Sequence, residues 1–431
     1  MPDAGAVRIV ISRFINFLLF LALLVALAGC TNQAQTPIAP TAAPVAAAPT
    51  FVLWHGWSGA ARQALTRLVD RYNQAHPEGR VFAQPMPLAN LASDLRAAAS
   101  AGAGPHLVLI PSGWLGGLAA DETLLPLNTL LSDAERAATI PAALGAAQAS
   151  GLDGNLQPYG QPITFDTLAL FYNRQNVLRP PESTADLLSI ARGLSEPTAT
   201  PPRWGLALNL SVETAIPYLY AFDGRLFDDQ GQLVLGDAGR AGTERWLEWT
   251  AAMNADGQLL ARPYKSVEVD RSLKSGQALM TFGWAHQMAE FRQLWGEQLG
   301  VAPLPRLSET DRAAAPWLQS DVLALNARIS PADQQAAVEF LRYMAGDEAQ
   351  RELLAAGLQP ASATLPLEGE DALTAAARSF RQQAATAQPM PNSFNRAQLR
   401  DDIWQMQRAV IEGRSTPADA VTEAVERIKL Q

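Results

Sequence analysis

Several tryptophans stand next to short apolar runs that have the pattern of β-strands. Trp54 and Trp57 flank the end of the first run, Trp284 follows a later one, and Trp317 lies shortly before another. In open α/β sheets, ligands bind at the carboxyl ends of the strands. An indole ring is a rigid surface that loses little entropy on binding, and the C–H face of a pyranose fits it. These placements therefore favour contact with a sugar-like ring.

Acidic side chains near the same runs can supply the polar half of such a site. The hydroxyl groups of a sugar need carboxylates and amides as partners, and Asp166, Glu213, Asp223 and Asp321 are the candidates. His55 is interpreted as a structural hydrogen-bond partner rather than a base.

The alternative is that the tryptophans only pack in the core or lie at the surface. For Trp246 and Trp249, which fall on an expected helix, we prefer this interpretation because aromatic residues on helices mostly pack.

An enzyme is the main competing hypothesis. Gly56-Trp57-Ser58-Gly59-Ala60 comes close to the G-x-S-x-G motif of hydrolases, with Ala60 in place of the last glycine. A secreted lipoprotein hydrolase with Ser58 as nucleophile is therefore the alternative, although Ser58 also suits the start of a helix. A glycosidase would need two opposed carboxylates, which a sequence cannot pair. A surface adhesion or sensor-presenting lipoprotein is a third hypothesis.

The composition excludes several other classes of protein. The chain has 431 residues, is 48% hydrophobic and carries a net charge of -9, which predicts a folded protein of two or three domains. An acidic chain lacks the general basic face that nucleic acid requires. The single cysteine and four scattered histidines, without an H-x-x-x-H pair, favour no metal site. We therefore expect no metal site. The preferred hypothesis of a sugar-binding protein also involves no cofactor and no catalytic residue.

The first thirty residues are typical of a targeting segment. Arg8 and Arg13 precede an apolar run over 14–28, which ends in Leu27-Ala28-Gly29-Cys30. This ending resembles the bacterial lipobox, in which the cysteine thiol takes a diacylglycerol. We expect residues 1–29 to be a lipoprotein signal peptide and Cys30 to be the lipidation site. An ordinary secretory signal or an anchor helix is the alternative.

A tether is expected between this anchor and the folded body. Residues 31–50 contain seven Ala, four Pro and four Thr and no charge. Frequent proline favours an extended, solvated backbone, so residues 30–50 form the acylated cysteine and a semi-rigid stalk.

From residue 51 onward the pattern is that of an α/β protein with mostly parallel sheets. Ser58 is expected to begin a helix that buries Leu65, Leu68, Val69 and Tyr72, which are spaced for one helical face. Ser330 and Thr416 are expected to begin two later helices. Strands are expected at 51–54, 107–110, 167–172, 204–208, 279–282 and 322–325.

The order and spacing of several segments resemble the extracellular solute-binding proteins of ABC importers, in their maltose-binding-protein-like, carbohydrate-binding subgroup. The segments are FVLWHGWSGAARQALTRLVDRYN (Phe51–Asn73), HLVLIPSGWLGGLAADETLLPLN (His106–Asn128), YGQPITFDTLALFYNRQNV (Tyr159–Val177), LKSGQALMTFGW (Leu273–Trp284), Ala337–Ala361, and PMPN (Pro389–Asn392) with Trp404 and TPADAVTEAVERI.

The resemblance implies a two-lobed periplasmic-binding-protein-like fold with the ligand cleft between the lobes. The N-terminal lobe would comprise residues 51–163 and 303–332, and the C-terminal lobe residues 164–302 and 333–431. The protein would be a monomer at a bacterial membrane and would not be an enzyme. It would bind a sugar, oligosaccharide or sugar-phosphodiester-like solute by hinge closure and deliver it to an ABC permease. The expected ligand contacts are Trp54, Trp57, Trp114, Asp166, Trp284, Trp317, Asp321 and Trp404.

One segment departs from the family pattern. The family often has Gly-Gly before "lfd", whereas residues 222–228 read Phe-Asp-Gly-Arg-Leu-Phe-Asp. Asp223 and Arg225 are therefore additional candidates to face the ligand.

Overall fold

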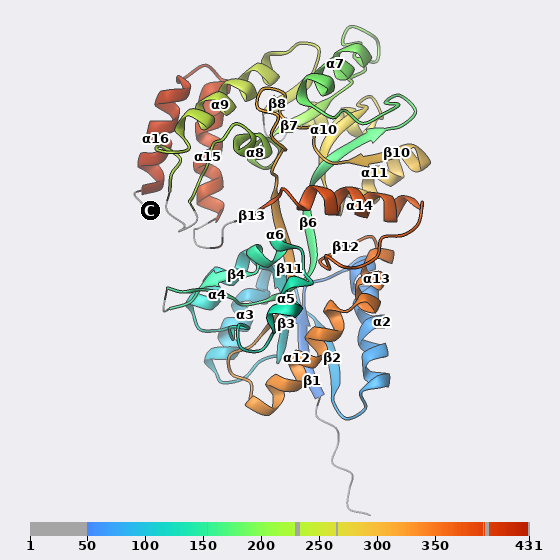
Figure 1. Ribbon diagram of the computed structural model, residues 1–431, viewed down its shortest axis with the longest axis vertical. Helices are drawn as coiled ribbons and strands as arrows, with labels where there is room; N and C mark the ends of the chain where they lie inside the picture. The colour runs from blue at the N-terminus through green and yellow to red at the C-terminus, as the bar shows by residue number, and fades with distance from the viewer. Residues whose placement is uncertain are drawn as a thin grey trace, which may run out of the picture. The chain divides into compact units, whose positions relative to one another are not determined.

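The computed structural model describes residues 50–152, 154–228, 233–263, 266–390, 392 and 396–429, and all of them belong to one compact unit (Figure 1). The expected signal peptide, Cys30 and the tether up to residue 49 lie outside the described residues. Thr50 already belongs to the first strand. Within the described ranges, no helix combines the length and apolar character that a membrane span requires.

The N-terminal lobe is built on parallel strands. β1 (Thr50–His55) pairs with β2 (Arg80–Pro85) on one side and with β3 (Leu107–Pro111) on the other. The expected helix is α2 (Gly59–Ala75), and its predicted buried face is confirmed. Ser58 is the residue before α2, but its side chain makes no capping hydrogen bond. The other elements of this lobe are α3 (Leu88–Ser100), η1 (Ser112–Trp114), α4 (Leu115–Ala120), α5 (Asp133–Ala137), β4 (Gln148–Ser150) and β5 (Leu156–Pro158). Helix α6 (Pro141–Ala146) lies at the junction of the lobes, where Ala143 packs in one cluster with Phe171 and Phe380.

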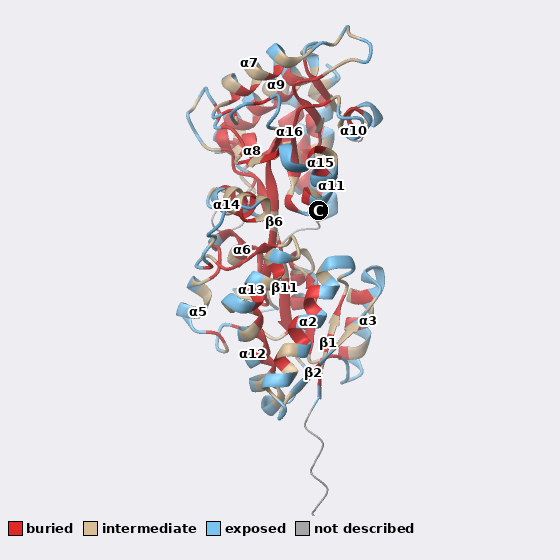
Figure 2. Cartoon of the chain, turned by 90° about the vertical axis from the view of Figure 1, so that its right-hand side faces the viewer, coloured by how far each residue is buried: buried red, intermediate tan, exposed pale blue. Residues whose placement is uncertain are grey.

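Two long strands connect the lobes. In β6 (Gln161–Asn173), Ile163 packs in the core of the N-terminal lobe and Leu168 in that of the C-terminal lobe. β11 (Trp317–Leu325) likewise has Trp317 in the second core and Leu323 in the first. Figure 2 shows buried residues along both strands. β6 and β11 are therefore the hinge strands.

The sheet pairing is mixed rather than mostly parallel. Among the described strands, parallel pairs join β1 with β2 and β3, β7 (Ala207–Leu210) with β8 (Leu260–Pro263), and β11 with β13 (Gln388–Pro389). The hinge strands pair antiparallel with each other. β11 also pairs antiparallel with β3, and β6 with β9 (Met280–Trp284) and β10 (Leu299–Ala302). The reason is that one hinge strand leaves the N-terminal lobe and the other returns to it.

The C-terminal lobe packs helices around shorter strands. Trp246 is completely buried in its core and donates to the carbonyl of Ala215 at 2.8 Å, and Trp249 packs against Tyr218, so the packing interpretation of both is confirmed. The lobe contains α7 (Thr184–Leu194), β7 (Ala207–Leu210), α8 (Val212–Ala221), α9 (Arg240–Ala255), β8 (Leu260–Pro263), α10 (Val267–Lys274), β9 (Met280–Trp284), η2 (Ala285–Gln287), α11 (Met288–Trp295), η3 (Gly296–Gln298), β10 (Leu299–Ala302), α14 (Ala372–Ala384), β13 (Gln388–Pro389), α15 (Arg396–Ile411) and α16 (Pro417–Lys429).

The predicted lobe boundaries need two corrections. Helices α12 (Pro331–Ala345) and α13 (Asp347–Ala355) pack with β1 in the N-terminal core, although the prediction assigns residues from 333 on to the other lobe. Leu304 and Leu307 lie in the C-terminal core, although the prediction assigns them to the N-terminal lobe. The chain enters the N-terminal lobe along β11, so Leu304 and Leu307 before this strand stay with the C-terminal core, and α12 and α13 after it join the N-terminal core. The chain then returns to the C-terminal lobe, where Leu399 and Val421 pack. β12 (Gln359–Pro360) then pairs with β6.

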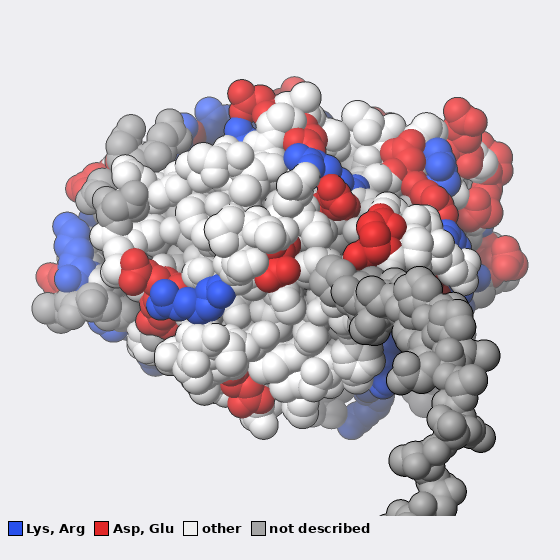
Figure 3. Space-filling model, turned by 90° about the horizontal axis from the view of Figure 1, so that it is seen from below, with Lys and Arg blue, Asp and Glu red and all other residues white. Residues whose placement is uncertain are grey.

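The surface charges are interspersed. On the face in Figure 3, acidic and basic side chains are scattered among uncharged ones. Exposed ion pairs such as Arg71–Glu348 join α2 to α13. Pairs of this kind contribute only about 0–1 kcal/mol each.

Candidate functional site

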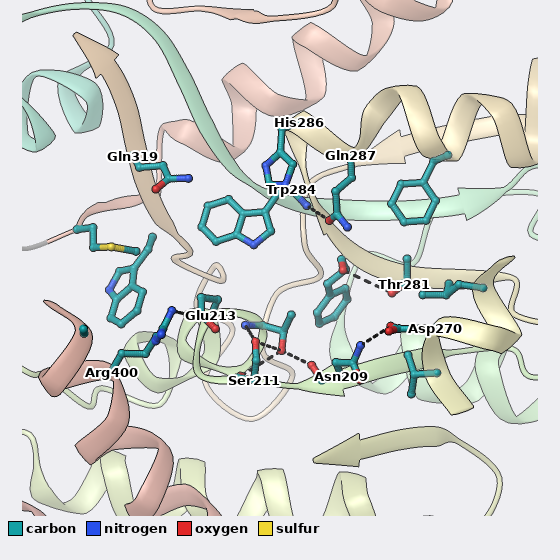
Figure 4. Close-up of a pocket in the computed structure, with 18 of the residues that line it drawn as sticks. Asn209, Ser211, Glu213, Asp270, Thr281, Trp284, His286, Gln287, Gln319 and Arg400 are labelled. Atoms are coloured by element: carbon teal, nitrogen blue, oxygen red, sulfur yellow. Dashed lines mark hydrogen bonds and ion pairs between the residues drawn. The ribbon is translucent and has the colours of Figure 1, made fainter. Parts of the chain in front are cut away.

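A cavity of about 650 Å³, here called the site cavity, lies where the C-terminal lobe meets the hinge strands (Figure 4). It is lined by the ends of β7 and β9, the starts of α8 and η2, one side of α10, and parts of β11 and α15. Its lining residues include Asn209, Ser211, Glu213, Asp270, Trp284, His286, Gln287, Trp317, Gln319 and Arg400.

Trp284 supplies the aromatic surface of the site cavity. It is the last residue of β9, is half-buried, and pairs with Leu168 of β6. Its indole lies among the labelled polar residues in Figure 4. The backbone N–H of Trp284 donates to Oε1 of Gln287 at 2.9 Å, which holds the turn after the strand. The ring is therefore positioned by sheet pairing and by a local cap together.

Trp317 lines the same cavity from β11 but is more deeply buried. It is only 3% exposed, and its Nε1 donates to the hydroxyl of Tyr220 at 3.1 Å. Trp317 lies directly before Leu318, which pairs with Thr167 of β6. β11 therefore lies along one side of β6, and β9 lies along the other side. Two indoles thus stand on either side of β6.

Polar groups surround these rings. Glu213, in the first turn of α8, lies 3.6 Å from the guanidinium of Arg400 on α15. Asn209 donates from Nδ2 to Oδ1 of Asp270 at 3.0 Å, which joins β7 to α10. Ser211 caps α8 by accepting from the N–H of Thr214. Carboxylate, amide and guanidinium groups offer paired acceptors and donors, so the cavity can bind neighbouring hydroxyls on one molecule.

A second cavity of about 250 Å³, here called the hinge cavity, adjoins the first and shares His286 and Gln319 with it. Asp166 of β6 is central to it. Its carboxylate accepts from Nδ1 of His286 at 2.6 Å and from Nε2 of Gln319 at 3.4 Å. The hydrogen bond that His286 donates to the Asp166 carboxylate raises the pKa of His286 above its ordinary value, against the opposing effect of partial desolvation.

Asp321 carries the site toward the N-terminal lobe. It lies on β11, two residues beyond Gln319, and lines the hinge cavity. Its Oδ2 accepts from Nε1 of Trp57 at 2.7 Å. Burial raises the pKa of the Asp321 carboxyl, the Trp57 hydrogen bond opposes this, and the negative charge of Asp166 adds to the rise. A half-buried carboxylate with this environment is well suited to bind a ligand that brings additional donors.

The structure therefore brings Asp166, Trp284, Trp317 and Asp321 to two adjoining cavities, with Trp57 bonded to Asp321. The other expected contacts do not line either of them. Trp54 donates to Gln84 at 3.2 Å and packs with Trp114 against the N-terminal core, and Trp404 packs against the C-terminal core.

The two candidates from the departing segment also lie elsewhere. Asp223 forms an ion pair with Arg312, and neither Asp223 nor Arg225 lines the site cavity or the hinge cavity.

Sequence reasoning singled out Glu213, but not several of its neighbours. His286 and Gln287 lie just after β9, and Asn209 lies near the end of β7. The rule that ligands bind at the carboxyl ends of strands would therefore have predicted all three. Arg400 lies on a helix more than 180 positions from Glu213, and no local signal pointed to it.

The hydrolase alternative has no geometric support. Ser58 is exposed and its backbone is ordinary extended chain, whereas a nucleophile elbow is strained. Among the described residues, no hydrogen bond joins Ser58 to a histidine. His55 is buried, and burial lowers the pKa of its imidazole. The described residues also contain no group of three metal-binding side chains.

The fold is similar to that of known solute-binding proteins. The structure of a cyclo/maltodextrin-binding protein complexed with maltotetraose matches with a TM-score of 0.77 and 19% identity, over 89% of this chain and 98% of that one. The maltose/maltodextrin-binding domain from Bdellovibrio bacteriovorus, bound to maltotriose, matches with a TM-score of 0.65 and 21% identity, over 88% and 100%. At these identities the likeness establishes the two-lobed fold.

Sequence comparison identifies the family. The maltotriose-binding protein of Pyrococcus abyssi (strain GE5 / Orsay) is 25% identical over 179 residues, which are 42% of this chain and 38% of that protein. The match thus spans well under half of that relative. Residues 67–381 match the model of the bacterial extracellular solute-binding proteins, whose location is outside the cytoplasm. Because this match covers most of the chain, the protein belongs to the family of bacterial extracellular solute-binding proteins.

Proposed function

We propose that this protein is the membrane-anchored binding component of an ABC importer and that it binds a neutral oligosaccharide. The sugar lies in the site cavity and extends into the hinge cavity. The observation that carries the proposal is the half-buried indole of Trp284 inside a cavity that also contains Glu213, Asp270 and Arg400. An aromatic surface surrounded by groups that bind hydroxyls matches the amphipathic faces of a pyranose.

The size of the site cavity supports a small ligand. Its 650 Å³ lies within the roughly 300–1,000 Å³ that is typical of small-molecule sites. The related proteins described above were solved with maltotriose and maltotetraose, which makes α-glucans the first class to test.

The charges favour a neutral sugar over a sugar phosphodiester. Asp166 and Asp321 face the hinge cavity, and Glu213 and Asp270 face the site cavity. Arg400 is held by Glu213, so its charge is already compensated. A phosphate would therefore meet carboxylates without a free guanidinium to balance it.

Binding is coupled to closure of the two lobes. Trp57 comes from the N-terminal lobe and donates a hydrogen bond to Asp321 of β11. Trp284 comes from the C-terminal lobe and pairs with Leu168 of β6. A ligand that contacts both lobes binds the closed arrangement more tightly and shifts the population toward it. The closed form then docks on the permease.

Lipid on Cys30 keeps the protein at the membrane in this proposal. The lipobox-like ending at Cys30 and the uncharged stalk support it. Each acyl CH₂ buried in the bilayer contributes about 0.8 kcal/mol.

The test is a sugar panel of maltose, maltotriose and maltotetraose, with a glycerophosphodiester as the charged comparison. Binding of a neutral sugar should raise the melting temperature and change tryptophan fluorescence, because the ligand stabilises only the folded state. Trp284→Ala should weaken binding by about 1–3 kcal/mol, measured as Kd by calorimetry, because the stacking surface is lost.

The matched control is Trp249→Ala. Trp249 of α9 packs against Tyr218 of α8 and does not line the site cavity, so its loss should affect stability and leave Kd unchanged. A panel of sugars that gives no signal with the wild type would overturn the sugar assignment. Unchanged affinity in Trp284→Ala would remove this residue from the site.

A further inference from the structure

A third cavity, here called the outer groove, runs between α10 and α11 and has a volume of about 620 Å³. It is almost as large as the site cavity. Lys274, Glu290, Gln293 and Leu294 line the outer groove and not the site cavity.

The outer groove continues directly from the site cavity. The two share Asp270, Leu273, Gln287 and Phe291 as lining residues. In Figure 4, Asp270 and Gln287 lie on the side of Trp284 away from Gln319.

The hinge cavity adjoins the site cavity by other residues, His286 and Gln319, and shares none with the outer groove. The three cavities therefore form a row, with the site cavity and Trp284 in the middle.

The lining of the outer groove is amphipathic. Leu273 and Leu294 are half-buried apolar side chains, and Phe291 is buried beneath them. Lys274, Glu290 and Gln293 are exposed donors and acceptors at its edge. An apolar floor with polar edges offers a surface for the C–H face of a sugar and partners for its hydroxyls, as the site cavity does.

The combined size is more than a short sugar needs. The site cavity and the outer groove together exceed the roughly 300–1,000 Å³ of ordinary small-molecule sites. A disaccharide held at Trp284 would leave the outer groove empty, whereas a linear oligosaccharide can occupy the row of cavities.

We infer that the outer groove is an additional saccharide subsite and that the protein selects linear oligosaccharides, whose distal units lie between α10 and α11. The inference rests on the proposed function, since it assumes a sugar at Trp284. It assigns to Lys274, Glu290 and Gln293 the role of binding the units beyond those in the site cavity.

The experiment measures Kd by calorimetry for maltose, maltotriose, maltotetraose and maltopentaose, with the full chain in mild detergent. The wild type should bind the longest sugar at least about tenfold more tightly than maltose, since each further unit adds contacts. The triple variant Lys274→Ala/Glu290→Ala/Gln293→Ala should lose most of this preference for length. Its affinity for maltose should remain that of the wild type.

The matched control removes a cation, an anion and an amide from exposed positions of the N-terminal lobe, as Arg328→Ala/Gln335→Ala/Glu339→Ala. It should keep the preference for longer sugars. Melting temperatures of both triple variants check that the fold is intact.

The outcomes separate the two claims. If maltose binds and affinity does not rise with length, or if the outer-groove variant keeps the full preference, the additional subsite is refuted and the sugar site at Trp284 stands. If none of the sugars binds to the wild type, the proposed function fails, and the subsite fails with it.

Discussion

Replacing Asp321 by asparagine should stabilise the protein and weaken its binding of sugar at the same time. The Asp321 carboxyl is half-buried on β11, accepts one hydrogen bond from Trp57 at 2.7 Å, and feels the negative charge of Asp166. Asparagine has nearly the same shape and can accept the same hydrogen bond. The substitution Asp321→Asn therefore removes a charge with little change in packing.

The direction of the stability effect follows from the raised pKa of Asp321. In the wild type, the contribution of this group to folding is present below the unfolded pKa, near 3.9, and is lost as the pH rises through the folded pKa. Each tenfold change in the ionisation constant is equivalent to about 1.4 kcal/mol. Asp321→Asn does not titrate, so its advantage should be largest at neutral pH and should disappear below about pH 4.

The effect on binding has the opposite sign. A hydrogen bond to a charged acceptor contributes about 1.5–3 kcal/mol, and one between neutral groups about 0.5–1.5 kcal/mol. Losing the charge while keeping the acceptor should therefore weaken sugar binding by about 1–1.5 kcal/mol, roughly five- to tenfold in Kd. A carboxylate that destabilises the free protein and strengthens binding is what a ligand site is expected to contain.

The assay is urea unfolding of wild type and Asp321→Asn over a range of pH, combined with calorimetry of the sugar that binds best. Asp311→Asn is the control, because the ion pair with Arg306 lowers the pKa of exposed Asp311 and its removal should not stabilise the protein. A buried, costly charge at Asp321 would be contradicted if Asp321→Asn were less stable than wild type at neutral pH, or if its advantage were independent of pH.

Two further predictions concern His286 and Cys30. The hydrogen bond that His286 donates to Asp166 raises the pKa of His286, so the contribution of His286 to stability is present below its unfolded pKa near 6.5 and is lost as the pH rises through the folded value. His286→Gln should therefore lower the melting temperature more at about pH 5.5 than at about pH 9. The difference should be equivalent to under about 1 kcal/mol, because the side chain of His286 is exposed. An equal loss of stability at both pH values would contradict this prediction. Wild type expressed in bacteria should partition into the detergent phase of Triton X-114, whereas Cys30→Ala should stay in the aqueous phase because it cannot be acylated; equal partitioning of the two would remove the lipid anchor.

Local signals in the sequence were sufficient for much of the architecture. The helix after Ser58 and its buried face follow from the spacing of Leu65, Leu68, Val69 and Tyr72, and the structure confirms them. The helix starts at Ser330 and Thr416 are also confirmed, since both side chains accept from the backbone three residues later. Such features depend on residues a few positions apart, which is why a sequence can predict them.

Pairing across the chain was not accessible in the same way. Glu213 and Arg400 are adjacent in space, and Trp57 reaches Asp321 across 264 positions. The prediction that assigned α12 and α13 to the C-terminal lobe was wrong for the same reason. The sequence of an amphipathic helix shows that it has a buried face, but it does not show which core covers that face.

Gly242 illustrates the difference between the two kinds of information. It lies within α9, where helix propensity by itself favours alanine by about 1 kcal/mol. In the folded chain, a Cβ at this position would lie 2.2 Å from the backbone nitrogen of Gly224, so close packing excludes any side chain.

The sequence by itself determined the elements, the apolar faces and the presence of tryptophans near strand ends. Only the tertiary structure decided which of those tryptophans share a cavity, because β6 and β11 run antiparallel and bring Trp284, Trp317, Asp166 and Asp321 to adjoining cavities. The physical reason is that hydrogen-bonding periodicity acts over a few residues, whereas the register between distant strands depends on the packing of the whole molecule.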